Sequence, residues 1–133
     1  MLMTDNPIPD GTKLLYIEHN LLSLNLMSAI CSVNPHVTLE SADTGPRGIE
    51  LAAKTRFTAI IVDIKLPDIG GYDVLTQLRK THPNVPVIAL TAGTSKEEKI
   101  KGARSGFSTY LTKPVNITEF WEVLAKPLAP QKH

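Results

Sequence analysis

The stretch AIIVDIKLPDIGG, residues 59–71, decides the fold class. Its first four residues are apolar on both faces of an extended chain, which is typical of a strand buried inside a parallel sheet. The apolar run stops at Asp63, and Pro67 with Gly70 and Gly71 then predicts a loop. A strand of this kind predicts a sheet that is covered on both sides and has a polar edge.

Four further apolar runs predict the other strands of this sheet. Each run is short and is closed by polar or turn-forming residues, which is typical of strands. The runs cover residues 14–17, 37–39, 85–90 and 109–111.

Apolar residues at helical spacing predict a helix after each strand. Asn34-Pro35 is expected to end the first helix, Gly45-Pro46 to open the second, and His82-Pro83 to end the third. The fourth should begin with a capping box at Ser95 and Glu98, but residues 96–101 are almost entirely polar, so weak anchoring is expected. The expected apolar face of the first helix consists of Leu22, Leu26, Ala29, Ile30 and Val33, and that of the last helix of Ile117, Phe120, Trp121 and Leu124.

Asn116 and Glu119 form a second capping-box pattern at the start of that last helix.

Five strands alternating with five helices favour a doubly wound α/β fold, because each parallel connection needs a crossover. With 133 residues, one domain is expected over residues 12–126, with a flexible lead-in at 1–11 and a flexible tail at 127–133.

The composition limits the function classes. The formal net charge is +1, from 14 Lys and Arg against 13 Asp and Glu, which argues against direct binding of nucleic acid. No apolar run approaches the ~20 residues that span a membrane, so no membrane association is expected. Cys31 is the only cysteine, which excludes an internal disulfide and favours a reducing, cytoplasmic location.

Polar residues follow the predicted strands, and in parallel sheets such residues meet at one edge, where ligands bind. They are Glu18 and His19 after the first strand, Asp63 after the third, Thr91 after the fourth and Lys113 after the fifth. Each one alone is more typical of a turn, a helix cap or a surface charge. Together they suit phosphoryl transfer to a carboxylate: Asp63 as nucleophile, Lys113 and Thr91 on the phosphoryl oxygens, and Glu18 helping to hold a cation.

Four motifs, in this order along the chain, resemble the receiver domains of bacterial response regulators and hybrid histidine kinases. They are LLYIEHN at 14–20, IVDIKLP at 61–67 with Gly71, ALTA at 89–92 and YLTKP at 110–114. The resemblance covers residues 13–124 and implies a flavodoxin-like sheet with strand order 2-1-3-4-5. It leaves open whether the chain is a stand-alone regulator or the receiver end of a hybrid kinase, although the sequence of residues 15–20 favours the hybrid kinase.

The resemblance also implies roles for individual residues. Asp63 would be phosphorylated by a partner histidine kinase or phosphotransfer protein, with Mg²⁺ held by Glu18, Asp63 and the backbone carbonyl of Lys65. Ala92 would add a backbone N–H to the phosphoryl site, and Lys113-Pro114 would be a cis peptide. Thr91 and Tyr110 would move as the switch. A downstream protein would bind the face made by the fourth helix, fifth strand and fifth helix.

His19 departs from the family pattern, because it stands where an acidic metal ligand is usual. An imidazole brings nitrogen and no negative charge, whereas Mg²⁺ prefers oxygen ligands, so weak Mg²⁺ binding is expected. Three alternatives remain open. Water and Glu18 could fill the vacant position, Mn²⁺ could bind in place of Mg²⁺, or the switch could work without a metal and with a protonated His19. A pseudo-receiver that binds partners without phosphorylation also remains open.

Enzymes on similar sheets fit the sequence less well. A phosphatase of the haloacid dehalogenase type would need a second acid where Lys65 stands. A flavodoxin would need a phosphate-cradling loop at residues 18–21, which read EHNL. A regulatory phosphoacceptor domain is therefore expected rather than an enzyme.

Overall fold

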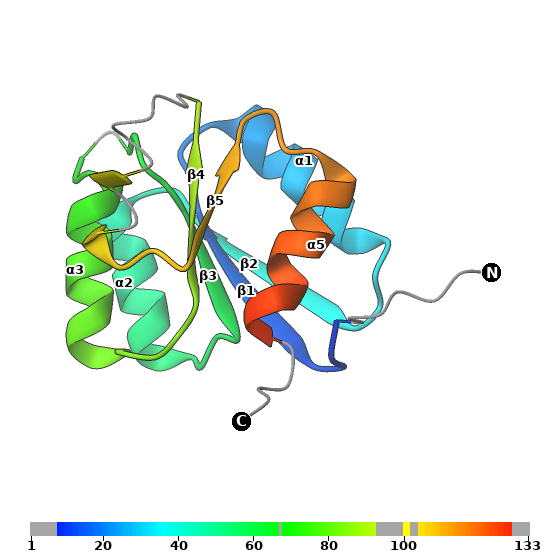
Figure 1. Cartoon of the computed structure of the whole chain (residues 1–133), viewed down its shortest axis with the longest axis horizontal. Helices are drawn as coiled ribbons and strands as arrows, with labels where there is room; N and C mark the ends of the chain where they lie inside the picture. Colours follow the sequence, from blue (N-terminus) through cyan, green and yellow to red (C-terminus); the bar gives the residue numbers. More distant parts are fainter. Residues whose placement is uncertain (1–7, 67, 93–99, 102–103, 129–133) are drawn as a thin grey trace.

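The computed structural model describes residues 8–66, 68–92, 100–101 and 104–128 (Figure 1). Five parallel strands form one sheet in the order β2-β1-β3-β4-β5. The flavodoxin-like order 2-1-3-4-5 is thereby confirmed. The strands are β1 (Thr12–Ile17), β2 (Val37–Ala42), β3 (Ala59–Asp63), β4 (Val87–Thr91) and β5 (Thr109–Thr112).

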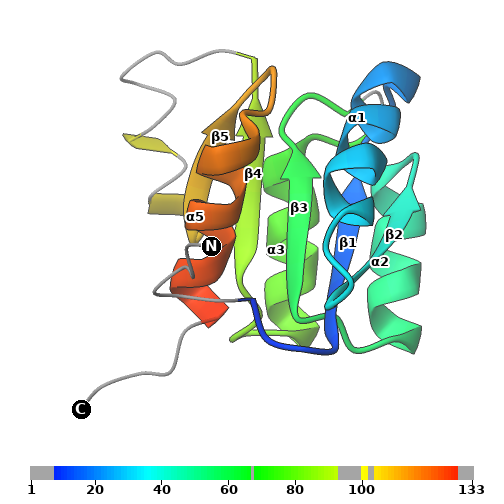
Figure 2. The ribbon, with the colours of Figure 1, turned by 90° about the vertical axis from the view of Figure 1, so that its right-hand side faces the viewer.

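Helices cover both faces of the sheet (Figures 1 and 2). The pair α1 (Leu21–Ser32) and α5 (Ile117–Leu128) lies on one face, and the pair α2 (Gly45–Lys54) and α3 (Gly71–Thr81) lies on the other. Alternate residues of the central strands enter two separate apolar layers. In β3, for example, Ile60 and Val62 face the layer under α2 and α3, while Ala59 and Ile61 face the layer under α1 and α5.

The predicted fourth helix lies mostly outside the described residues. Of that region, residues 100–101 and 104–105 are helical. The predicted fourth strand begins later than expected, at Val87 instead of Val85, and it includes Thr91.

The predicted apolar face of α1 was wrong in most of its members. Leu22 is 78% exposed and Val33 is 74% exposed, and Leu26 and Ala29 are also exposed. Ile30 is buried as predicted, and the helix packs it against the sheet together with Met27 and Cys31. Two apolar stripes run along this helix at helical spacing, and the pattern alone does not decide which stripe packs on the sheet.

The start and the buried face of α5 agree better with the sequence prediction. The side chain of Asn116 accepts a hydrogen bond from the backbone N–H of Glu119 at 2.9 Å, so the expected cap of α5 is confirmed. Phe120 and Leu124 are buried as expected, but Ile117 is 55% exposed because it lies on the outer side of the first turn.

The packed unit extends before Thr12. Ile8, within the expected lead-in, is buried in the apolar layer under α1 and α5. The hydroxyl of Thr12 donates a hydrogen bond to the carbonyl of Pro9 at 2.6 Å, which ties this segment to β1. Among the described residues, no helix is both long and apolar enough to cross a membrane.

Candidate functional site

The polar residues predicted from the strand ends lie at the carboxyl edge of the sheet. Parallel register brings the ends of β1, β3, β4 and β5 to this edge. The residues concerned are Glu18 directly after β1, Asp63 at the end of β3, Thr91 at the end of β4 and Lys113 directly after β5.

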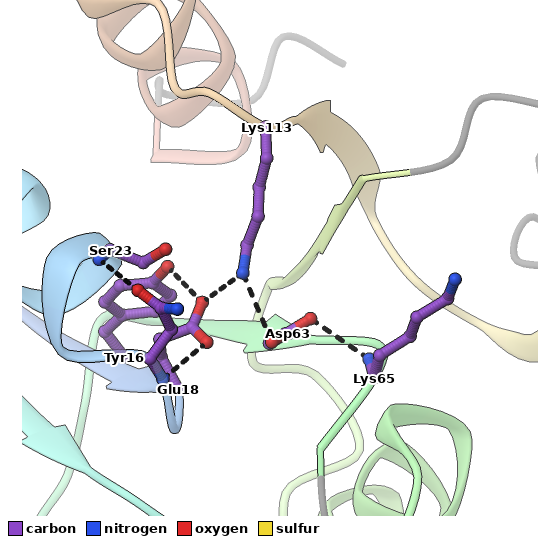
Figure 3. Close-up of polar contacts among 7 residues, drawn as sticks. Tyr16, Glu18, Ser23, Asp63, Lys65 and Lys113 are labelled. Carbon is purple, nitrogen blue, oxygen red and sulfur yellow. Dashed lines mark hydrogen bonds and ion pairs between the residues drawn. The ribbon is translucent and has the colours of Figure 1, made fainter.

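Lys113 joins the two carboxylates of the site (Figure 3). Its Nζ atom lies 2.7 Å from Oε1 of Glu18 and 3.3 Å from Oδ2 of Asp63. Both carboxylates are buried, whereas the lysine side chain is 23% exposed. Partial burial acts to lower the pKa of Lys113, but the two carboxylates raise it above its usual value, so the ammonium group stays charged.

Glu18 is held by three donors. The hydroxyl of Tyr16 donates to Oε1 at 2.7 Å, and the backbone N–H of Asn20 donates to Oε2 at 3.1 Å, in addition to the contact with Lys113. Burial acts to raise the pKa of Glu18, but the hydrogen bonds to its carboxylate outweigh burial and lower the pKa. Glu18 is therefore the more acidic member of the buried pair.

Asp63 has a different environment. Oδ1 accepts a hydrogen bond from the backbone N–H of Lys65 at 3.0 Å, while Oδ2 faces Lys113. Burial raises the pKa of Asp63, and the neighbouring Glu18 carboxylate raises it further. The side chain of Lys65 is exposed and extends away from Asp63, so only its backbone belongs to the site (Figure 3).

The remaining predicted residues lie around this centre. Thr91 is buried, and Ala92, which follows it, is exposed. Tyr110 is half-buried, with its ring centroid 6.1 Å from that of Phe107. The Lys113–Pro114 peptide bond is cis, as the resemblance implies.

Sequence reasoning missed Tyr16, whose hydroxyl is part of the site. The signal was available, because residues two apart on a strand point to the same face, and Tyr16 precedes Glu18 by two. The alternation of faces does not show, however, that the Tyr16 side chain is long enough to reach the end of its own strand.

A divalent cation would find few protein ligands here. Among the described residues, no three His, Cys, Asp or Glu side chains are grouped closely enough to hold a metal ion, and His19 is exposed. The oxygen atoms of Asp63 and Glu18 nevertheless suit a hard cation such as Mg²⁺. With both ionised, two carboxylates and one ammonium group leave one net negative charge, so the residues present fit such an ion with modest attraction.

A carboxylate at a strand end, an ammonium group beside it and a buried hydroxyl on the same edge can together accept a phosphoryl group. The combination of this site with a parallel sheet in the order 2-1-3-4-5 is characteristic of receiver domains. The profile of the response regulator receiver domain family matches residues 14–125, and the chain belongs to this family. It is a receiver domain of the two-component type, a class of regulatory domain.

Individual relatives agree with this assignment. The transcriptional regulatory protein HprR of Escherichia coli is 36% identical over 107 residues, which are 80% of this chain and 47% of the relative. CusR of the same organism is 38% identical over 88 residues, or 66% and 37% of the two chains. The chain thus spans about a third to a half of the length of the curated relatives it matches.

Solved structures show the same architecture. A CheY-like receiver domain from Methanospirillum hungatei has a TM-score of 0.80 at 26% identity, covering 88% of this chain and 93% of that one. The receiver domain of the sensor histidine kinase PA1611 of Pseudomonas aeruginosa has a TM-score of 0.78 at 26% identity, covering 86% and 94%. That structure has a magnesium ion coordinated in its active-site cleft.

Proposed function

We propose that this domain accepts a phosphoryl group on Asp63 from a phosphohistidine of a partner histidine kinase or phosphotransfer protein. The observation that carries the proposal is the position of Lys113, whose Nζ atom contacts both Asp63 and Glu18 at the carboxyl edge. A carboxylate oxygen of Asp63 attacks phosphorus, the bond to the histidine nitrogen breaks, and that nitrogen keeps the electron pair.

The surrounding groups suit the charge that this transfer brings to the site. Lys113 is a point charge for one phosphoryl oxygen, and the hydroxyl of Thr91 and the backbone N–H of Ala92 are donors for others. Asp63 is already fixed through Oδ1 by the backbone N–H of Lys65, so it presents its carboxylate in one orientation. Positioning and charge neutralisation are the main contributions a protein makes to phosphoryl transfer.

Asp63, Glu18 and the backbone carbonyl of Lys65 would hold the divalent cation. When bound, the cation would neutralise negative charge on the phosphoryl oxygens. Because His19 contributes no negative charge, we propose that Mg²⁺ binds weakly and that Mn²⁺, which accepts nitrogen ligands more readily, can take its place.

Phosphorylation then acts as a switch through Thr91 and Tyr110. A phosphoryl group that draws Thr91 toward Asp63 opens space behind it, and the half-buried ring of Tyr110 on the neighbouring strand can fill that space. The downstream partner is expected on the face formed by the predicted fourth helix, β5 and α5.

The test is phosphorylation by acetyl phosphate, followed by intact-protein mass spectrometry, with and without Mg²⁺ or Mn²⁺. Wild-type protein should gain the mass of one phosphoryl group, and Asp63→Asn should not. Asp73→Asn is the matched control, because Asp73 is an exposed acid in the first turn of α3 and should leave phosphorylation unchanged. Wild-type protein that gains no phosphoryl group with either ion would support the phosphorylation-independent alternative.

A further inference from the structure

Tyr16 lies in the apolar layer between the sheet and the pair α1 and α5, yet its hydroxyl belongs to the polar edge. The side chain is fully buried, and its neighbours in that layer include Leu14, Met27 and Phe120. A buried tyrosine hydroxyl needs a partner, and here the partner is Oε1 of Glu18 at 2.7 Å. The hydroxyl thus connects the interior of the domain to the site.

Oε1 of Glu18 accepts two hydrogen bonds at once. Tyr16 and Lys113 each lie 2.7 Å from this oxygen, and Asn20 takes one position on Oε2. A carboxylate offers about four lone-pair positions, so about one remains for any further partner. The carboxylate of Glu18 is therefore directed mainly toward protein donors.

We propose that Tyr16 is a positioning residue that sets how Glu18 divides its carboxylate between Lys113 and a divalent cation. Its hydroxyl fixes Oε1 against the lysine, which keeps the ammonium group between the two carboxylates and occupies a lone pair that a cation would otherwise use. This inference rests on the proposed function, and it gives a role to Tyr16, for which the sequence predicted none.

The variant Tyr16→Phe removes the hydroxyl and keeps the buried ring. In Tyr16→Phe, Oε1 has a vacant lone pair, and we expect Mg²⁺ to bind about two- to tenfold more tightly than in wild type. The dissociation constant can be measured by following backbone amide signals of residues 18, 63 and 65 by NMR, with no phosphodonor present. Tyr72→Phe is the matched control, because it removes a tyrosine hydroxyl on the opposite side of the sheet.

A second measurement needs no metal. The NMR signal of the Lys113 ammonium group reports its contacts with the carboxylates, and it should shift in Tyr16→Phe but not in Tyr72→Phe. If Tyr16 acts through Glu18, the shift caused by Tyr16→Phe should become much smaller when Glu18→Gln is also present. A role of Tyr16 in packing alone would give the same shift in both backgrounds.

The outcomes separate this inference from the proposed function. An unchanged Lys113 signal together with unchanged Mg²⁺ affinity in Tyr16→Phe overturns the positioning role, even if the wild type is phosphorylated normally. Wild-type protein that binds neither Mg²⁺ nor Mn²⁺ and gains no phosphoryl group overturns the proposed function and the cation part of this inference. In that case the Lys113 signal still decides whether Tyr16 positions Glu18.

Discussion

Gly71 packs directly against the backbone that carries Asp63. A Cβ atom added at Gly71 would lie 2.9 Å from the carbonyl oxygen of Asp63 and 2.7 Å from Cα of Ile64. The backbone N–H of Gly71 also donates to the carbonyl of Ile64 at 2.9 Å. The start of α3 and the end of β3 therefore fix each other, and the position of Asp63 depends on the absence of a side chain at residue 71.

Gly71→Ala is expected to lower the free energy of unfolding by about 1–3 kcal/mol, because backbone atoms that cannot move easily would have to shift. It should also slow phosphorylation of Asp63 by acetyl phosphate, since the nucleophile moves with its backbone. Urea denaturation and mass spectrometry measure the two effects.

Gly70→Ala is the control for this prediction. The atom nearest to an added Cβ there is the carbonyl oxygen of Ile64, at 4.0 Å, which is an ordinary contact. Its stability should stay within roughly 0.5 kcal/mol of wild type. Equal effects of the two substitutions would show that the tight contact at residue 71 does not matter.

His19→Asp restores a carboxylate at the position where the family usually has one. Because added negative charge attracts a divalent cation, Mg²⁺ affinity should increase by about tenfold or more. Calorimetric titration of the unphosphorylated protein measures this affinity, and phosphorylation by acetyl phosphate should become faster in parallel. His36→Asn, at an exposed histidine beside Asp10, is the control and should bind Mg²⁺ as wild type does. Unchanged affinity in His19→Asp would remove position 19 from the metal site.

Lys113→Met removes the positive charge between the two carboxylates. We expect the rate of phosphorylation to fall by about a hundredfold, because a charge that stabilises the transferring group is lost. The substitution should also destabilise the protein near neutral pH, since Glu18 and Asp63 then repel each other without compensation.

The pH dependence of Lys113→Met has a defined sign. An acid whose pKa is raised by folding binds its proton more readily in the folded state. When ionised, it therefore lowers the free energy of unfolding, and this loss disappears as the pH drops through the folded pKa. Asp63 is such an acid. The stability gap between Lys113→Met and wild type should therefore narrow as the medium is acidified, as measured by urea denaturation at several pH values. Lys126→Met, at an exposed lysine in the last turn of α5, should show neither effect.

Much of this architecture could be predicted from the sequence, because apolar runs and turn residues encode the order of strands and helices directly. The strand ends were also informative, since the topology of a parallel sheet brings Glu18, Asp63 and Lys113 to the same edge independently of the loop conformations. The orientation of α1 could not be predicted in this way. Met27 and Leu26 are neighbours on the chain with similar apolarity, and only packing on the sheet determines that Met27 is buried. The contact of Tyr16 with Glu18 depends in the same way on side-chain reach.

Arg79 connects three segments on the side of the sheet covered by α2 and α3. Its guanidinium group donates to the backbone carbonyls of His82 at 3.1 Å, Val85 at 2.6 Å and Gly106 at 3.1 Å. The carbonyls belong to the end of α3, the approach to β4 and the approach to β5. Burial lowers the pKa of Arg79, but an arginine remains charged at neutral pH.

Arg79→Lys is expected to lower the free energy of unfolding by about 1–3 kcal/mol, because a lysine cannot reach three carbonyls with one ammonium group and leaves acceptors unpaired. Hydrogen exchange should show the loss mainly at the amides of β4 and β5, since these strands lose their common anchor. Arg47→Lys is the control, because Arg47 pairs with exposed Glu50 on the surface of α2 and such pairs contribute little. If hydrogen exchange were equally fast in both variants, Arg79 would be a surface charge with no role in holding β5 on the sheet.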